Sequence, residues 1–235
     1  MATAMPEDWP GGGHRTPSRR VPDYLARKHL VRALTRAVAQ HLEARHHLLV
    51  IDVGAGEKPY YPLFRPYARY YLGVDYRPRP NSDIAAVAEA LPIRDQCTDV
   101  VLATQMLEHV EDPGATIREW RRVLRPGGLI FASTHGVFLY HPDPADYWRW
   151  THAGLRKLFE DAGLRILSLE ACGGNASALG MLVALHLTRA AHRVRLASVM
   201  GILLVPFHKL VELVDGRRTG MPSLAINYLV VAQRD

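Results

Sequence analysis

Short apolar runs recur along the chain, separated by stretches that are richer in polar residues, glycine and proline. A short apolar run is typical of a strand that is buried on both faces of a parallel sheet. Such runs occupy residues 48–53, 70–75, 99–104, 129–134, 165–170 and 223–233. The pattern therefore predicts an α/β fold.

Helical patterns lie between several of these runs. Over residues 23–45 an aliphatic residue recurs at every fourth position, which marks one face of an amphipathic helix. The residues of that face are Leu30, Leu34, Val38 and Leu42. Asp112 followed by Pro113 is typical of a helix start, and Thr151 is of the type that caps a helix. We therefore expect helices to alternate with the strands.

Two glycines follow directly after the first predicted strand, in the sequence LLVIDVGAG. Asp52 lies near the end of this strand, at the edge of the sheet where open α/β folds bind ligands. Gly54 and Gly56 would let backbone amides approach a ligand closely. Asp75, about twenty residues after Gly54, ends the next run and is placed to accept hydrogen bonds from ribose hydroxyls. An ordinary glycine turn is the alternative.

The residues after this turn argue against a dinucleotide. The dinucleotide fingerprint is G-x-G-x-x-G, and the chain has Pro59 at the third glycine. Asp52, Gly54 and Gly56 instead form acid-x-G-x-G, which resembles the first motif of the class I S-adenosylmethionine (SAM) methyltransferases. That family often has another glycine two positions on, where this chain has Lys58.

The middle of the chain extends the resemblance, to the branch that includes the ubiquinone-type enzymes. That branch has the patterns D-A-x-x-L-P-F, F-D-V-V and L-E-H-V. The matching residues are Ala88, Leu91, Pro92, Asp99, Val100, Val101, Leu107, Glu108, His109 and Val110. Val87 replaces the acid that would bind the adenine amino group, so we expect the backbone or Glu89 to contact adenine. RVLRPGG and LIFAST continue the match as far as Thr134.

The resemblance implies a Rossmann-like sheet of seven mostly parallel strands, with helices on both faces and an antiparallel last strand. It implies SAM as the cofactor, with Asp75 on the ribose, Gly54 and Gly56 beside the methionine moiety, and Asp52 orienting its amino group. The cofactor-binding residues expected are Asp52, Gly54, Ala55, Gly56, Asp75, Tyr76, Ala88, Glu89 and Gln105.

Polar and aromatic residues crowd the segment after the fifth predicted strand, where we expect the methyl acceptor. Methyl transfer from a sulfonium needs a base only if the acceptor is a hydroxyl that must lose its proton. His141 and His135 lie in this segment and are the candidate bases, since histidine is the natural base near neutral pH. His109 is the alternative. Each histidine could equally cap, pack or be exposed.

Two strongly apolar runs, at 178–188 and 196–207, flank a basic break in the chain. Neither reaches the roughly twenty residues that span a bilayer. We expect a helical insertion at about 176–215 within a domain that covers 22–235. It could lie on a membrane, cover a lipid acceptor, pair two subunits or pack on the sheet. Residues 1–21, rich in glycine, proline and arginine, are expected to be a disordered tail.

The charge and the cysteine content of the chain indicate which binding partners and which cellular compartment to expect. The net charge of +6 comes from scattered arginines without interleaved aromatics, so we expect no nucleic-acid partner. Cys97 and Cys172 belong to no C-x-x-C pattern, so neither a disulfide framework nor a metal site is indicated. We therefore expect a cytoplasmic protein, either free in the cytoplasm or bound peripherally to the inner face of the membrane.

These observations predict a SAM-dependent methyltransferase. The acceptor expected is a small or lipid-linked molecule, such as a glycolipid or another amphipathic compound, that is methylated on oxygen. Pairing of two subunits through the insertion, to form a homodimer, is a further possibility. The alternatives are a non-catalytic SAM-binding or membrane-associated scaffold, and a nicotinamide-dependent oxidoreductase.

Overall fold

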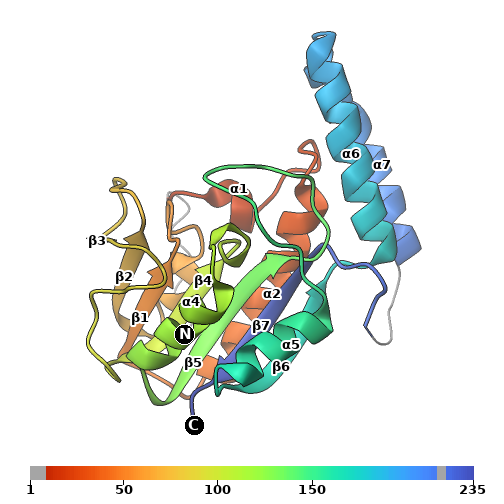
Figure 1. Ribbon diagram of the computed structural model, residues 1–235. Helices are drawn as coiled ribbons and strands as arrows, with labels where there is room; N and C mark the ends of the chain where they lie inside the picture. Colours follow the sequence, from red (N-terminus) through yellow and green to blue (C-terminus); the bar gives the residue numbers. More distant parts are fainter. Residues whose placement is uncertain (1–8, 216–220) are drawn as a thin grey trace.

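The computed structural model describes residues 9–215 and 221–235. Seven strands form one sheet in the order β3-β2-β1-β4-β5-β7-β6 (Figure 1). Their bounds are β1 Leu48–Val53, β2 Ala68–Asp75, β3 Ile84–Ala85, β4 Thr98–Thr104, β5 Leu124–His135, β6 Arg165–Cys172 and β7 Asn227–Gln233. The five neighbouring strands β3, β2, β1, β4 and β5 pair in parallel. Strand β7 runs antiparallel to both of its neighbours, β5 and β6. The prediction of a Rossmann-like, mostly parallel sheet with an antiparallel last strand is confirmed.

Helices cover both faces of the sheet (Figure 1). The helical elements are α1 Gly12–Arg15, α2 Tyr24–Leu42, α3 Tyr61–Phe64, the 3₁₀ turn η1 Leu107–His109, α4 Pro113–Val123, α5 His152–Asp161, α6 Asn175–Arg193 and α7 Ala197–Asp215. Helix α2 packs its leucine face on one side of the central strands, together with α3. Helices α4 and α5 pack on the opposite side. Asp112 and Thr151 cap α4 and α5 with their side chains, as predicted.

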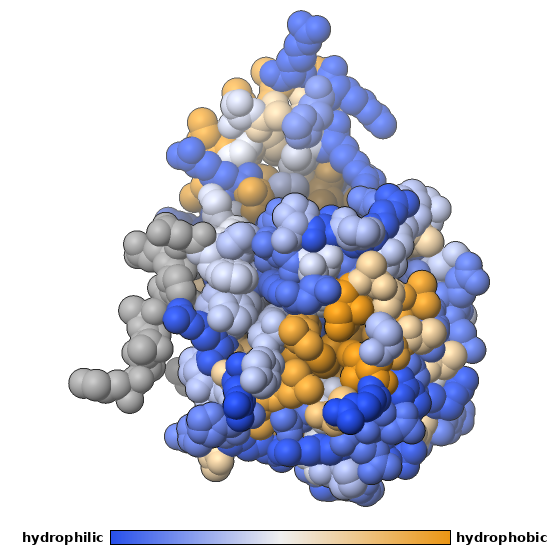
Figure 2. Space-filling view, turned by 90° about the vertical axis from the view of Figure 1, so that its left-hand side faces the viewer, coloured by the Kyte–Doolittle hydropathy of each residue, from blue (hydrophilic) through white to orange (hydrophobic). Residues whose placement is uncertain are grey.

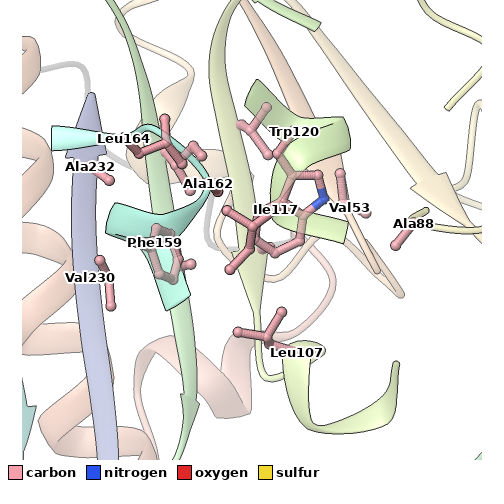
Figure 3. Close-up of a cluster of buried hydrophobic side chains, with 14 of the residues drawn as sticks. Val53, Ala88, Leu107, Ile117, Trp120, Phe159, Ala162, Leu164, Val230 and Ala232 are labelled. Atoms are coloured by element: carbon pink, nitrogen blue, oxygen red, sulfur yellow. The ribbon is translucent and has the colours of Figure 1, made fainter. Parts of the chain in front are cut away.

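The larger core lies between the sheet and α4 and α5 (Figure 3). Trp120 and Ile117 of α4 and Phe159 of α5 are fully buried there against alternate residues of the strands, such as Val53 and Val230. Burial of this kind stabilises a fold by about 25 cal/mol for each Å² of apolar surface removed from water. The core holds the strands rigidly, so the turns at their carboxyl ends keep fixed positions.

The N-terminal segment differs from the prediction of a disordered tail. Residues 1–8 lie outside the described residues, but residues 9–21 have a defined structure that includes α1. Arg15 is buried and donates to the carbonyl oxygens of Trp9, Pro10 and Pro59, each at 2.7 Å. Composition suggested disorder because it reports only local preference, whereas Arg15 is held in part by a carbonyl group more than forty residues away.

Helices α6 and α7 occupy the segment predicted to be a helical insertion. They pack side by side and project from the body of the molecule (Figure 1). Their proximal ends pack on α2 through Tyr24 and Leu25, which contact Ala178, Met181 and Val211. The distal part of this helical pair shows both apolar and strongly polar surface (Figure 2).

Candidate active site

A cavity of about 550 Å³ opens at the carboxyl ends of β1, β2 and β4. Cavities of 300–1,000 Å³ are typical of small-molecule sites. Seven of the predicted cofactor residues line it: Gly54, Gly56, Asp75, Tyr76, Ala88, Glu89 and Gln105. The predicted base His109 also lines it. The structure thus brings together residues from three separate motifs of the sequence.

The glycine turn after β1 fits closely against the turn after β4. Gly54 has φ +71°, and a Cβ atom at this position would lie 2.9 Å from Cβ of Met106. A residue with a side chain would therefore meet both strain and a clash. Gly56 has φ +52° but has open space around it. Its amide donates a hydrogen bond to Oδ2 of Asp75 at 3.1 Å, which ties the turn to the end of β2.

Asp75 is buried at the base of the cavity. The amide of Arg77 donates to its Oδ1 at 3.4 Å, and Nε of Arg79 lies 3.4 Å from its Oδ2. Arg79 also lines the cavity, which the sequence reasoning missed. Arg79 lies in the irregular loop after β2, where a spacing of four residues from Asp75 does not indicate a contact, so no local pattern pointed to it. A carboxylate held in this way at the cavity can accept hydrogen bonds from a diol.

Asp52 and Ala55 do not line the cavity. Asp52 is buried beneath the glycine turn, where the Tyr71 hydroxyl donates to its Oδ2 at 2.6 Å. Burial raises the pKa of Asp52 to about 7. Ala55 is also buried, and its amide donates to the carbonyl oxygen of Val74 at 3.1 Å. Both residues therefore shape the turn from behind, and the expected role of Asp52 toward an amino group stays a prediction.

Lys58 stands where the resembled methyltransferases often have a glycine, and its backbone conformation is one that glycine adopts easily. Its backbone has φ +53°, in the left-handed region that glycine adopts easily. The side chain passes over Gly73, where it leaves no room for a Cβ atom, and its Nζ reaches Oδ2 of Asp83 at 2.5 Å. This ion pair joins the glycine turn to the loop after β2.

The other side of the cavity is formed by the turn after β4 and by the loop at 136–150. Met106, Val110 and Glu111 contribute from the turn, and Asp143, Pro144 and Tyr147 contribute from the loop. The loop is fastened to the turn. The Tyr147 amide donates to the carbonyl oxygen of Glu108 at 2.9 Å, and Nε1 of Trp148 donates to that of Val110 at 2.8 Å. The 136–150 loop is therefore a wall of the site, in the segment where the sequence placed the acceptor.

The three candidate histidines lie together, in two layers. His109 lines the cavity. The ring of His141 lies behind it, with its centroid 5.1 Å from that of His109 and 5.2 Å from that of His135. His135 is buried, and burial lowers its pKa to about 3, so it is neutral. Of the three, only His109 is among the residues that line the cavity.

His109 has a defined tautomer. Its Nδ1 lies within hydrogen-bonding distance of the carbonyl oxygen of Ala145, which can only accept. In the neutral ring Nδ1 therefore carries the proton and Nε2 the lone pair. A neutral imidazole with a lone pair on Nε2 can accept a proton.

Glu108 is a buried carboxyl group that the sequence reasoning treated only as part of a motif. Oγ1 of Thr134 donates to its Oε2 at 2.9 Å, and Nε2 of His135 lies 3.1 Å from its Oε1. Burial raises the pKa of Glu108 to about 7. Glu108 precedes the cavity-lining His109 in the turn after β4 but does not itself line the cavity.

The same residues include two sets with the ligand types of a metal site. Glu108, His135 and His141 each offer a ligand atom within 4.8 Å of the others, and so do His109, His141 and Asp146. Nδ1 of His135 lies 2.8 Å from Oδ1 of Asn227, whereas Oε1 of Glu108 has no hydrogen-bond partner among the described residues. The expectation of no metal stays a prediction.

Comparison with known proteins supports this interpretation. Residues 51–132 match the family model described as a methyltransferase domain. A Mycolicibacterium smegmatis protein named "Probable S-adenosylmethionine-dependent methyltransferase" is 32% identical over 181 residues, which are 69% of this chain and 68% of that protein. The similarly named Rv3030 of Mycobacterium tuberculosis is 33% identical over 153 residues, 60% of this chain and 54% of that protein.

Solved structures support the fold in the same way. The [4+2]-cyclase SpnF superposes with a TM-score of 0.57 at 21% identity, covering 87% of this chain and 80% of that one. At this identity the likeness concerns the fold alone, and the family rests on the sequence relatives. By its motifs, its cavity and its similarity to the Mycolicibacterium smegmatis protein, the chain belongs to the S-adenosylmethionine-dependent methyltransferases.

Proposed function

We propose that the protein transfers the methyl group of SAM to a hydroxyl group of a small amphipathic molecule, and that His109 is the base. The observation that carries the proposal is one cavity with two different ends. The glycine turn and Asp75 form one end, and His109 with the 136–150 loop forms the other. A cofactor and an acceptor bound in this cavity would lie side by side.

The cofactor end fits SAM. Gly54 and Gly56 both line the cavity, and Gly56 has open space beside it and donates its amide to the carboxylate of Asp75. Asp75 would bind the ribose hydroxyls, and Ala88 and Glu89, which also line the cavity, would contact the adenine ring. Bound SAM supplies a methyl group already activated on a sulfonium.

The acceptor end combines apolar and polar surface. Met106, Val110 and Pro144 are its apolar residues, and Glu111 and Tyr147 add polar groups that are exposed at the rim. An amphipathic acceptor suits this end, because its reactive group can enter while the remainder extends outward. A glycolipid or a lipid-linked sugar has this form.

His109 supports methylation on oxygen. As the acceptor oxygen forms its bond to the methyl carbon and the bond from carbon to sulfur breaks, the hydroxyl proton must leave. Nε2 of His109 carries the lone pair that takes this proton, and the bond from Nδ1 to Ala145 holds the ring. Alignment of the reacting groups supplies the rest of the rate enhancement.

Two alternatives differ in what they predict. A non-catalytic SAM-binding scaffold would bind the cofactor without transferring its methyl group. A nicotinamide-dependent oxidoreductase would bind NAD instead, and the family to which the chain belongs gives it no support. Calorimetric titration with SAM, S-adenosylhomocysteine and NAD separates these classes.

The binding test uses Asp75→Asn, with Asp161→Asn as the matched control because Asp161 is exposed on α5. We expect SAM and S-adenosylhomocysteine to bind the wild-type protein. We expect Asp75→Asn to weaken both by about 10- to 100-fold, as the loss of hydrogen bonds to a charged group does. Binding of NAD alone, or equal binding by both variants, would refute the proposed site.

The transfer test uses SAM with a labelled methyl group and a panel of glycolipids and lipid-linked sugars. His109→Asn keeps a donor toward the Ala145 carbonyl but has no basic nitrogen. We expect it to lower the transfer rate by roughly 10²–10⁴-fold while SAM still binds, since that is the usual contribution of a general base. His152→Asn, an exposed histidine on α5, is the control. SAM binding without transfer to any acceptor would favour the scaffold.

A further inference from the structure

Helix α7 is apolar on the side that faces away from the protein. Its exposed large aliphatic residues are Val199, Ile202, Leu203, Leu210, Leu213 and Val214. At 100° per residue these positions fall within an arc of about 120° on the helix surface. Leu213 is 78% exposed. A surface helix of a soluble protein normally has polar residues on this side.

The opposite side of α7 already has its partners. Its buried residues are Leu204, His208 and Val211, and Val211 packs closely against Gly180 of α6. Glu212 anchors the proximal end on the body of the protein, where it pairs with Arg19 at 3.0 Å and with Lys28. The exposed stripe is therefore not the core-facing side of a displaced helix.

Helix α6 adds a second apolar stripe. Leu179, Val183 and Leu187 are exposed and follow one another at intervals of four residues, so they share one side of the helix. We call α6 and α7 together the hairpin. It projects from the body of the molecule, so its exposed residues are accessible (Figure 1).

The distal end of the hairpin is basic. Arg189, Arg193 and Arg195 are exposed, and none has an ion pair within residues 9–215 and 221–235. Residues 189–211 contain these three arginines and Lys209 but no aspartate or glutamate. Cations therefore stand beside aliphatic residues with no anion of the hairpin near them in sequence, and Figure 2 shows both kinds of surface on the projecting part.

We propose that the hairpin docks the protein on an anionic lipid bilayer, with the aliphatic stripes among the acyl chains near the headgroups and the three arginines on lipid phosphates. Helices with aliphatic and basic residues bind membrane surfaces in this manner. A second copy of the chain fits less well, because the carboxylates of the hairpin, Glu212 and Asp215, already have partners at its proximal end. A lipid surface supplies both the apolar and the anionic partner.

The hairpin is suited to a position in the interface. Each helix has 19 residues and is therefore about 28 Å long. Among the described residues, α7 is the one helix that is long and apolar enough to cross a membrane by length and composition. Its Lys209 and the arginines at the distal end favour a position along the surface, where the charges stay in water. This inference is independent of methyl transfer.

The experiment is co-sedimentation of the full chain with vesicles of phosphatidylcholine alone and of phosphatidylcholine with phosphatidylglycerol. We expect stronger binding to the anionic vesicles. Joint replacement of Arg189, Arg193 and Arg195 by glutamine should lower that binding by roughly a hundredfold, at about 1 kcal/mol for each basic residue. Ile202→Ser with Leu213→Ser should weaken binding to both kinds of vesicle by about tenfold.

The matched control replaces three exposed basic residues of the body, Arg156, Lys157 and Arg165, by glutamine, which changes the net charge equally. It should bind anionic vesicles far better than the hairpin variant. SAM titration of every variant checks that the fold is intact. Equal loss in control and hairpin variants would overturn the proposal, because general charge would then account for the binding. So would a dimer that binds no vesicles and dissociates when Ile202 and Leu213 are replaced.

Discussion

Nε2 of His135 lies 3.1 Å from Oε1 of Glu108, and both side chains are buried. Oδ1 of Asn227 accepts a hydrogen bond from Nδ1 of His135 at 2.8 Å, so Nε2 carries a lone pair. Oε1 of Glu108 makes no hydrogen bond within the described residues, and burial raises the pKa of Glu108. Burial therefore favours the protonated carboxyl group beside the neutral ring of His135.

Glu108→Gln tests this protonation state, because glutamine has nearly the shape of the protonated acid and carries no charge. The raised pKa of Glu108 means that its contribution to stability is fully present below about pH 4.5 and is lost as the pH rises through about 7. We predict that Glu108→Gln is about 2 kcal/mol more stable than wild type at about pH 8, and loses this advantage near about pH 5. Urea unfolding at both values measures it, and a variant less stable at the higher pH would contradict the neutral form.

Gly54 and Gly56 should respond differently to alanine. Both have positive φ, which costs an alanine about 1–2 kcal/mol. At Gly54 the new Cβ would also press on Met106, and overpacking adds about 1–3 kcal/mol. We predict that Gly54→Ala lowers both stability and SAM affinity more than Gly56→Ala does. Denaturant unfolding and calorimetry on the two variants compare them directly, and equal effects would rule out the clash.

Asp146 should hold the 136–150 loop in place. Its side chain is buried, accepts from both terminal nitrogens of Arg149 at 2.5 and 2.6 Å, and accepts from the His141 amide at 2.9 Å. Asp146→Asn should reduce the free energy of opening this loop by about 1.5–3 kcal/mol, the usual value of charged hydrogen bonds. Hydrogen exchange of the His141 amide reports the opening. Asp143→Asn, an exposed neighbour in the loop, should leave the exchange unchanged.

Arg15 should matter to the cofactor site although it lies far from it in sequence. It donates to the carbonyl oxygen of Pro59, which follows the glycine turn. Arg15→Ala removes the donors of three hydrogen bonds, and we predict a loss of about 1–3 kcal/mol in stability together with weaker SAM binding. Calorimetry and urea unfolding test it against Arg20→Ala, an exposed control. Full SAM affinity in Arg15→Ala would show that the segment only caps the fold.

Much of the fold could be predicted because its signals are local. The apolar run before Gly54, the four-residue repeat of α2 and the caps Asp112 and Thr151 each report on their own neighbourhood, and the structure places them as expected. The cofactor end of the cavity was predictable for a related reason. In a parallel sheet the carboxyl ends of strands meet at one edge, so motifs that follow strands converge there.

The rest of the site depends on contacts between distant segments. His135 was expected beside the acceptor, but it ends β5 and pairs with Asn227 of β7, which buries its ring. No local pattern reveals that pairing. Arg15 and Lys58 show the same limit. Arg15 binds the carbonyl group of Pro59 and Lys58 pairs with Asp83, and both partners are distant in sequence and come close only in the folded protein.

In the register of β6 and β7, Cys172 pairs with Asn227, and β6 is the edge strand of the sheet. The chain therefore leaves the sheet after Cys172 and comes back to it at the neighbouring strand. Helices α6 and α7 lie between these two strands in sequence and pair with no strand, so their length can change without altering the strand pairing. A change confined to α6 and α7 would therefore alter the proposed docking surface while the glycine turn and the strand pairing stay the same.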